Sequence, residues 1–182
     1  MKALAVAVLL AAGAARAEPL SPGSLEVLGG AISGTGADAK RLGFGYQIGA
    51  SAAWQPIDTQ RRWGSTIRWS VLFAGLYDGT AEQVNPPLRT VMMDLTAGIR
   101  FRPWGSATRY LTARVGGGLF RSNDPIMGTT RAYVGPVASI GLDQYLGNLI
   151  VGIDVRYALV PTPFTDAPAQ IAVVLRFGVA GP

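Results

Sequence analysis

The stretch Leu149–Leu159, LIVGIDVRYAL, alternates between two kinds of side chain. Its large apolar residues are Leu149, Val151, Ile153, Val155 and Tyr157. Its small or charged residues occupy the positions between them, namely Gly152, Asp154, Arg156 and Ala158. Side chains of a β-strand point alternately to its two faces, so only a strand separates these two sets. The stretch therefore predicts a strand with one apolar face and one polar face.

Seven further stretches show the same alternation. The full set of predicted strands is 24–33, 42–54, 65–77, 91–101, 111–119, 132–142, 149–159 and 171–177. The first has the weakest contrast, because Leu28 and Ile32 share a face with Glu26. Eight strands that close on one another leave no unpaired edge. The pattern predicts an all-β fold, an eight-stranded antiparallel up-and-down β-barrel.

The composition indicates which face points outward. Charged residues are 15% of the chain, against about 25% in globular proteins. The second face carries mainly Gly, Ser, Thr and Ala with a few Arg and Asp, which suits a narrow lumen better than a solvated surface. This favours a transmembrane barrel with its large apolar side chains in the bilayer. The alternative is a soluble, lipocalin-like periplasmic lipid binder, whose apolar face would line a cavity.

The N-terminal residues have the features of an export signal. Lys2 precedes an apolar run, and Ala15-Arg16-Ala17 fits the small-residue cleavage rule. We expect residues 1–17 to be a cleavable signal peptide, 18–23 an N-terminal periplasmic segment and 24–182 the barrel. This organisation predicts the outer membrane of a Gram-negative bacterium as the location.

The alternation also assigns charged residues to the lumen. They are Glu26, Arg68, Asp94, Arg100, Arg114, Asp154, Arg156 and Arg176. Buried charge is costly unless it is paired, so these five arginines and three carboxylates predict a salt-bridge network that plugs the barrel and fixes strand register. The alternative is a water-lined path or an anion site that uses the surplus arginines.

Aromatic residues gather near the predicted strand ends. They are Trp54, Trp63, Tyr77, Trp104, Tyr110 and Phe164. Aromatic rings concentrate at the two interfaces of membrane barrels, so this placement predicts two girdles.

With these features the chain resembles the small eight-stranded outer-membrane barrels typified by the OmpA transmembrane domain, OmpX and OmpW. The alternating Val173, Leu175 and Phe177 resemble the family's terminal assembly signal, although residues 178–182 follow the aromatic. The resemblance implies recognition by the barrel-insertion machinery through these three residues. It also implies contact with outer-membrane lipid and lipopolysaccharide, and envelope protein partners.

Catalytic chemistry has little support in the sequence. The chain contains no histidine and no cysteine, which excludes Ser-His and Cys-His nucleophiles and His- or Cys-ligated metals. We therefore predict no enzyme, no cofactor and no metal site. Arginines scattered through strands do not form a nucleic-acid patch. The predicted function is a non-enzymatic barrel with a structural or interaction role in the envelope, and the alternative is a narrow channel for small hydrophobic or anionic solutes.

Overall fold

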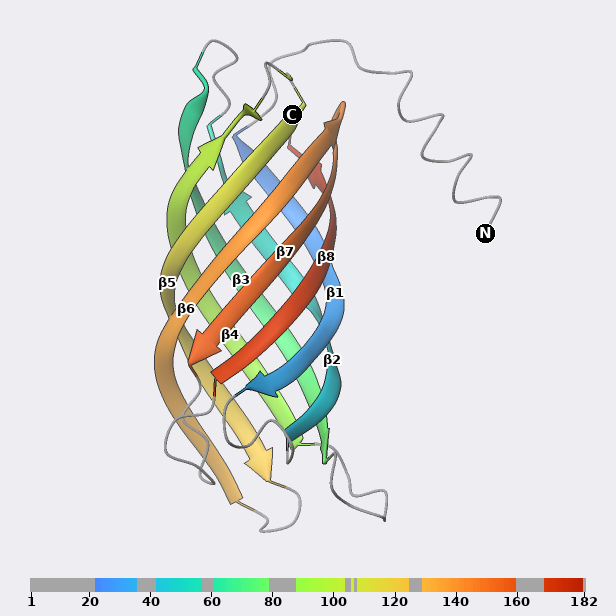
Figure 1. The fold of residues 1–182 in the computed structure, drawn as a ribbon, viewed down its shortest axis with the longest axis vertical. Helices are drawn as coiled ribbons and strands as arrows, with labels where there is room; N and C mark the ends of the chain where they lie inside the picture. The colour runs from blue at the N-terminus through green and yellow to red at the C-terminus, as the bar shows by residue number, and fades with distance from the viewer. Residues whose placement is uncertain are drawn as a thin grey trace, which may run out of the picture.

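The computed structural model describes residues 22–35, 42–56, 61–78, 88–103, 106, 108–124, 129–159 and 169–181. These residues form eight strands (Figure 1). Their bounds are β1 (Gly23–Thr35), β2 (Leu42–Trp54), β3 (Trp63–Asp78), β4 (Leu88–Phe101), β5 (Arg109–Asp124), β6 (Thr129–Leu146), β7 (Leu149–Leu159) and β8 (Ala169–Ala180). The predicted signal peptide lies outside the described residues and stays a prediction.

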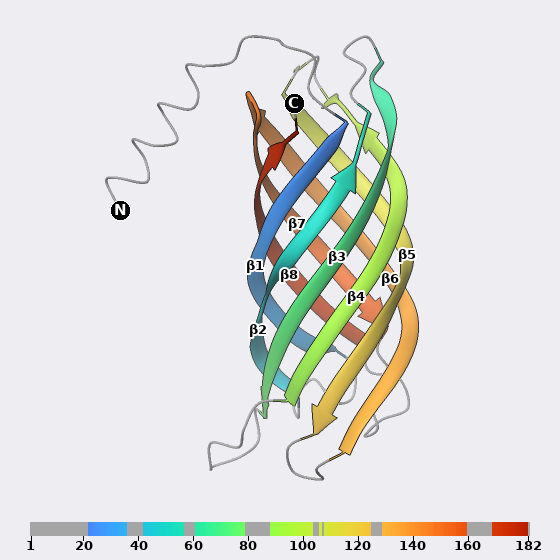
Figure 2. The same ribbon diagram turned by 180° about the vertical axis from the view of Figure 1, so that it is seen from behind.

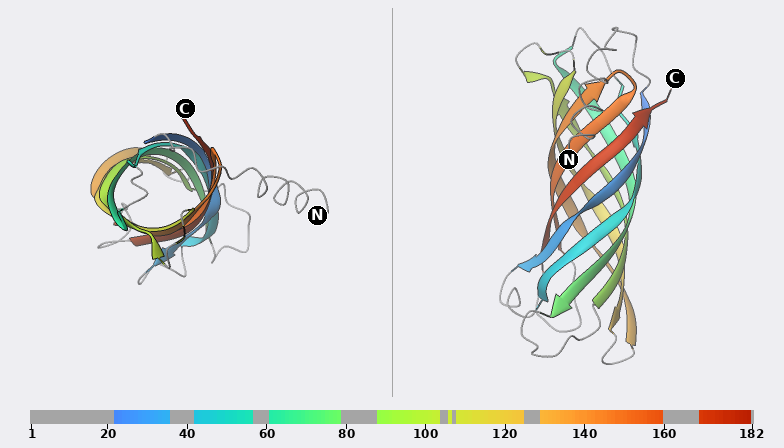
Figure 3. Two further views of the ribbon diagram at one scale, coloured as in Figure 1. Left: turned by 90° about the horizontal axis from the view of Figure 1, so that it is seen from above. Right: turned by 90° about the vertical axis from the view of Figure 1, so that its right-hand side faces the viewer.

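Each strand pairs antiparallel with its neighbours in the chain, and β8 pairs with β1 to close the barrel. The view from behind shows the same tilted strands on the far wall (Figure 2). The view along the barrel shows a closed ring (Figure 3). We call the end where β1 begins and β8 ends the terminal edge, and the opposite end the loop edge. The predicted eight-stranded up-and-down fold is confirmed.

The stagger of the strands fixes the width of the barrel. Following paired residues once around from Ser24 leads back to β1 at Gly34, ten residues further along. With about 3.3 Å per residue along a strand and about 4.8 Å between strands, this stagger tilts the strands by roughly 40°. An eight-stranded barrel of this kind has an interior that its own side chains can fill.

The two faces of each strand differ as the sequence predicts. On β7 the buried positions are Ile150, Gly152, Asp154, Arg156 and Ala158, and they alternate with positions that face outward. The bounds of β2 and β7 agree with the prediction, whereas the other strands extend further at their ends. At these strand ends the residues still pair with the neighbouring strand, but their side chains no longer alternate clearly between apolar and polar. The sequence pattern therefore ends before the backbone pairing does.

The connection between β6 and β7 is a two-residue turn at Gly147 and Asn148, at the terminal edge. Gly147 has a φ of 64°, in the left-handed region that glycine adopts without steric cost. The turn holds Leu146 opposite Leu149 and so sets the register of this hairpin.

Glycine at position 116 permits a close approach of β5 to β4. A Cβ there would lie 2.0 Å from the carbonyl oxygen of Leu95 and 2.7 Å from the Cα of Thr96, both of them backbone atoms. We expect Gly116→Ala to lower the free energy of unfolding by about 1–3 kcal/mol, because the strands must separate. Urea titration of the refolded protein in lipid vesicles measures this.

Gly29 on β1 provides the matched control, because a Cβ there would meet nothing within 4 Å. We expect Gly29→Ala to change the free energy of unfolding by less than about 0.5 kcal/mol. Equal effects of the two substitutions would contradict the close approach at Gly116.

Candidate functional site

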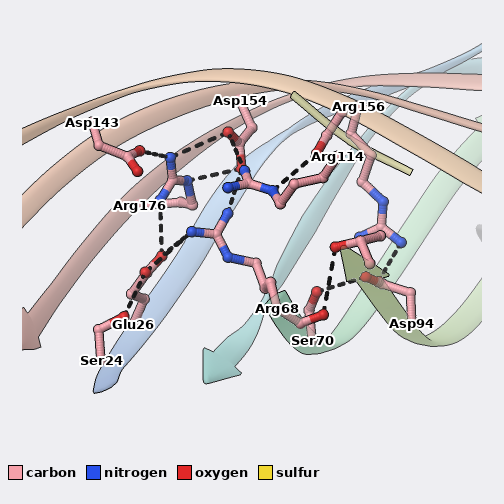
Figure 4. Close-up of polar contacts among 12 residues, drawn as sticks. Ser24, Glu26, Arg68, Ser70, Asp94, Arg114, Asp143, Asp154, Arg156 and Arg176 are labelled. Carbon is pink, nitrogen blue, oxygen red and sulfur yellow. Dashed lines mark hydrogen bonds and ion pairs between the residues drawn. The ribbon is translucent and has the colours of Figure 1, made fainter. Parts of the chain in front are cut away.

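The lumen brings together charged side chains from seven of the eight strands (Figure 4). Each lies on the inward-facing set of its strand, and none is more than 7% exposed. They are Glu26, Arg68, Asp94, Arg100, Arg114, Asp143, Asp154, Arg156 and Arg176. The structure thus brings all eight predicted residues into the lumen and adds Asp143.

Asp154 on β7 is the centre of the largest group. Its carboxylate oxygens accept from Arg68 Nη1 at 2.8 Å and from Arg114 Nη2 at 2.9 Å. Arg176 Nε lies 2.8 Å from Asp154 Oδ2. One carboxylate therefore joins guanidinium groups from β3, β5 and β8, which are not neighbours of one another in the sheet.

Glu26 on β1 extends this group across the closing seam of the barrel. Arg176 Nη1 lies 3.0 Å and Arg68 Nη2 lies 3.1 Å from Glu26 Oε2. The hydroxyl of Ser24 donates to Glu26 Oε1 at 3.1 Å. We call the set Glu26, Arg68, Arg114, Asp143, Asp154 and Arg176 the central cluster.

Sequence reasoning missed Asp143, which forms an ion pair with Arg176. The predicted strand ended at Leu142, whereas β6 continues to Leu146. Asp143 has the same parity as the inward Gly141 and Tyr145, and continuing the alternation by one position would have found it. The described lumen charges are thus five arginines and four carboxylates, so the predicted surplus of two arginines falls to one.

Asp94 and Arg156 form a second, smaller group nearer the loop edge. Arg156 Nη2 lies 2.5 Å from Asp94 Oδ2, and the hydroxyl of Ser70 donates to Asp94 Oδ1 at 2.9 Å. A cavity of about 20 Å³ lies between this pair and the central cluster. Polar and apolar side chains line it together: Leu28, Arg68, Ser70, Leu72, Asp94, Thr96, Val137, Ser139, Asp154, Arg156 and Val174. A cavity of that size holds about one water molecule.

Arg100 stands apart from both groups, near the terminal edge. Its guanidinium donates to the carbonyl of Pro56 and lies over the ring of Tyr110, 4.7 Å from the ring centroid. Tyr110 packs edge-on against Tyr145, whose hydroxyl accepts from the amide of Gln55. These side chains cover the lumen at this end, and Arg100 is the cation in excess of the carboxylates.

The half of the lumen toward the loop edge is mainly apolar, whereas the sequence predicted a lining of small and polar side chains. A cluster of buried side chains fills it: Leu28, Ile32, Leu72, Ala74, Leu76, Met92, Phe120, Val137, Ala158, Ala172 and Val174. Buried polar side chains also lie there, namely Thr90, Ser122 and Gln170. On β5, Phe120 lies one residue beyond the predicted strand 111–119. On β3, Leu72, Ala74 and Leu76 follow Arg68 at inward positions within the predicted strand 65–77. The lumen is therefore layered, with the central cluster on one side and an apolar filling on the other.

Of the six aromatic residues predicted to form the girdles, the structure describes the side chains of three, namely Trp54, Trp63 and Tyr110. Trp54 and Trp63 are 48% and 59% exposed at the terminal edge, and Trp63 packs against Phe101 with ring centroids 4.4 Å apart. Tyr110 is only 2% exposed and points into the lumen. It lies on the same face of β5 as the inward Thr112, and the outward Leu111 lies on the other face. Its interfacial assignment was wrong, since position near a strand end does not decide the face. The Tyr77 side chain, Trp104 and Phe164 lie outside the described residues.

The outer surface is dominated by large apolar side chains that are 37–77% exposed, and they occur on every strand. Among the side chains that the structure describes, the charged ones in this exposed class are all arginines: Arg61, Arg62, Arg89, Arg109 and Arg121. Each described carboxylate is buried in the lumen. Among the described side chains, negative charge is thus confined to the lumen.

The residues that the structure describes contain neither a cluster of metal ligands nor a membrane-crossing helix. No group of three or more Asp or Glu side chains there could hold a metal ion. The same residues contain no helix long and apolar enough to cross a membrane, a finding that does not concern crossings by strands.

A closed up-and-down barrel with an apolar exterior and buried side chains in its lumen has the architecture of the small outer-membrane β-barrels. No protein-family model matches the chain, and no curated protein does. Solved structures do match. Neisserial surface protein A superposes with a TM-score of 0.57 and 15% identity, over 90% of this chain and 100% of that one.

Two further structures agree. Ail, the attachment invasion locus protein of Yersinia pestis, gives a TM-score of 0.54 with 17% identity, over 88% of this chain and 99% of its own. The N-terminal β-barrel domain of Pseudomonas aeruginosa OprF gives 0.52 with 10% identity, over 87% of this chain and 98% of its own. At these identities the likeness establishes the fold, which is that of the small eight-stranded outer-membrane barrels.

Proposed function

We propose that this protein is a non-enzymatic integral barrel of the Gram-negative outer membrane, with a closed lumen and a structural or interaction role in the envelope. The observation that carries the proposal is the outward placement of the large apolar side chains. Soluble monomers rarely expose contiguous apolar surface beyond a few hundred Å², whereas this exterior is apolar around the whole barrel. Hydrocarbon is the solvent that suits such a surface.

The height of the apolar belt supports a single bilayer crossing. On β5 the exposed Arg109 and Arg121 bracket five outward positions: Leu111, Ala113, Val115, Gly117 and Leu119. Twelve residues at the strand tilt correspond to roughly 30 Å along the barrel axis. The apolar band of outer-membrane barrels is about 25 Å tall, so the arginines would lie at its two borders. An even number of strands directs the terminal edge to the periplasm and the loop edge to the outside.

The layered lumen supports closure rather than conduction. Buried side chains occupy both the charged half and the apolar half of the described lumen. The cavity between the Asp94–Arg156 pair and the central cluster, about 20 Å³, has room for about one water. The channel alternative needs a continuous path, which this filling disfavours. The lipocalin-like alternative would leave the apolar exterior in water. It would also require a lipid to bind in a lumen that, in this barrel, carries nine buried charged side chains. Both features disfavour this alternative.

Partners follow from the same surfaces. Outer-membrane phospholipid and lipopolysaccharide would surround the belt. The barrel-insertion machinery would recognise β8 through Val173, Leu175 and Phe177, which are 45%, 49% and 57% exposed. Envelope proteins would dock at the barrel edges.

The proposal is tested by solubility and by electrical recording. We expect the refolded protein to need detergent or lipid to stay in solution, because water cannot solvate the belt. In planar bilayers we expect no steady conductance, since the lumen is filled. A detergent-free monomer would contradict the membrane location, and a steady ohmic current would contradict the closed lumen.

A further inference from the structure

The exposed arginines of the loop edge lie together on two neighbouring strands. Arg89 is on β4 and Arg121 is on β5, and both side chains point outward. In the register of the two strands Arg89 pairs with Asn123 and Arg121 pairs with Val91. The two arginines are therefore diagonal neighbours on one face of the sheet, a relation that puts Cβ atoms about 7–8 Å apart. Their guanidinium groups can reach one anion together.

Nothing described around the pair neutralises it. Its other cross-strand neighbours are Gly75 on β3 and Ala132 on β6, which are small and uncharged. Neither arginine takes part in an ion pair among the described residues. Each described carboxylate is in the lumen, so the side chains next to these arginines leave an outward positive charge uncompensated.

The surface directly below the pair, toward the middle of the belt, is apolar. Phe73, Met93 and Leu119 are exposed there by 54%, 42% and 49%. A molecule that fits this surface has an anionic group at the height of the arginines and hydrocarbon beneath it. A guanidinium pair matches phosphate oxygens, to which it donates charge-assisted hydrogen bonds.

We propose that Arg89 and Arg121 bind a phosphate group of lipid A, the phosphorylated glycolipid of the outer leaflet. The proposal rests on the membrane location and orientation given above, because it needs the loop edge to lie in the outer leaflet. Lipid A is the occupant that joins phosphate and acyl chains at this height. The arginine pair would fix the depth of the barrel as well as hold the lipid.

The test is native mass spectrometry of the detergent-solubilised protein titrated with bisphosphorylated lipid A. We expect the Arg89→Gln/Arg121→Gln variant to bind lipid A about tenfold or more weakly than the wild type. The reason is that each arginine near an anionic lipid surface contributes to the free energy of binding. The matched control is Arg62→Gln/Arg109→Gln, which removes two exposed arginines from the terminal edge and should leave lipid A affinity unchanged. Dephosphorylated lipid A should bind the wild type as weakly as intact lipid A binds the loop-edge variant.

Three results would overturn the proposal. They are unchanged affinity in the loop-edge variant, an equal loss in the terminal-edge control, and equal displacement of lipid A by phosphatidylglycerol, which would make the contact one with any anionic lipid. Failure here is distinguishable from failure of the membrane proposal. If the protein needs detergent but its affinity for lipid A does not depend on Arg89 and Arg121, only the lipid A proposal is wrong. If the protein is soluble without detergent, the membrane proposal and the lipid A proposal are both wrong.

Discussion

Replacing Asp154 with alanine is expected to lower the free energy of unfolding by about 3–5 kcal/mol, which is the usual cost of leaving buried charges without their partner. Asp154 contacts Arg68, Arg114 and Arg176, all in the lumen. Its removal leaves five described guanidinium groups against three carboxylates. Urea titration in lipid vesicles, followed by the heat-dependent gel mobility of folded barrels, measures the loss.

Asp94 supplies a comparison within the same lumen, because its carboxylate has one arginine partner, Arg156. We expect Asp94→Ala to cost less than Asp154→Ala. Adding Arg114→Met to the Asp154→Ala variant should restore part of the stability, since it removes one of the uncompensated cations. A loss below about 1 kcal/mol for Asp154→Ala, or a larger loss for Asp94→Ala, would show that the central cluster does not hold the barrel together.

Placing an arginine in the middle of the belt is the second change with a large expected effect. Val155 and Leu149 lie on the outer face of β7 and are both 47% exposed, but Val155 is mid-strand and Leu149 is at the terminal edge. In a bilayer we expect Val155→Arg to cost about 2–4 kcal/mol and Leu149→Arg about 0–1 kcal/mol, because the penalty depends on depth.

The equal exposure of these two residues makes the pair informative. In water, arginine at either position would be solvated and both variants would be nearly as stable as the wild type. The measurement is the free energy of unfolding of each variant in phospholipid vesicles. Two small and equal costs would mean that the exterior of the barrel faces water, and the membrane location would then be wrong.

The sequence predicted the fold because the alternation in the strands is local and binary. Position 154 is inward because 153 and 155 are apolar, and no tertiary information is needed to see it. The same reasoning placed all eight predicted charges in the lumen. It failed at Asp143, because the predicted strand ended one residue too early. It also failed at Tyr110, which was assigned to the interface from its position near a strand end rather than from the alternation of inward and outward residues.

The pairing of the charges could not be predicted, because it depends on the stagger between strands. Arg68 and Asp154 lie 86 positions apart in the chain and meet only in a barrel of this shear. A different register would place them at different heights in the lumen. The apolar part of the lumen was not predicted for a related reason. Leu72 and Met92 are large apolar residues on the otherwise small or polar face of their own strands, and they form a cluster only with residues of other strands.

The seam between β1 and β8 makes completion of the barrel depend on the last strand to be synthesised. Until β8 arrives, Glu26 has only Arg68 as an ion-pair partner among the described residues, and one side of β1 has unpaired backbone groups. An open strand edge is a template for pairing with other chains. A truncated chain that lacks β8 is therefore expected to be more prone to aggregation and proteolysis than the closed barrel.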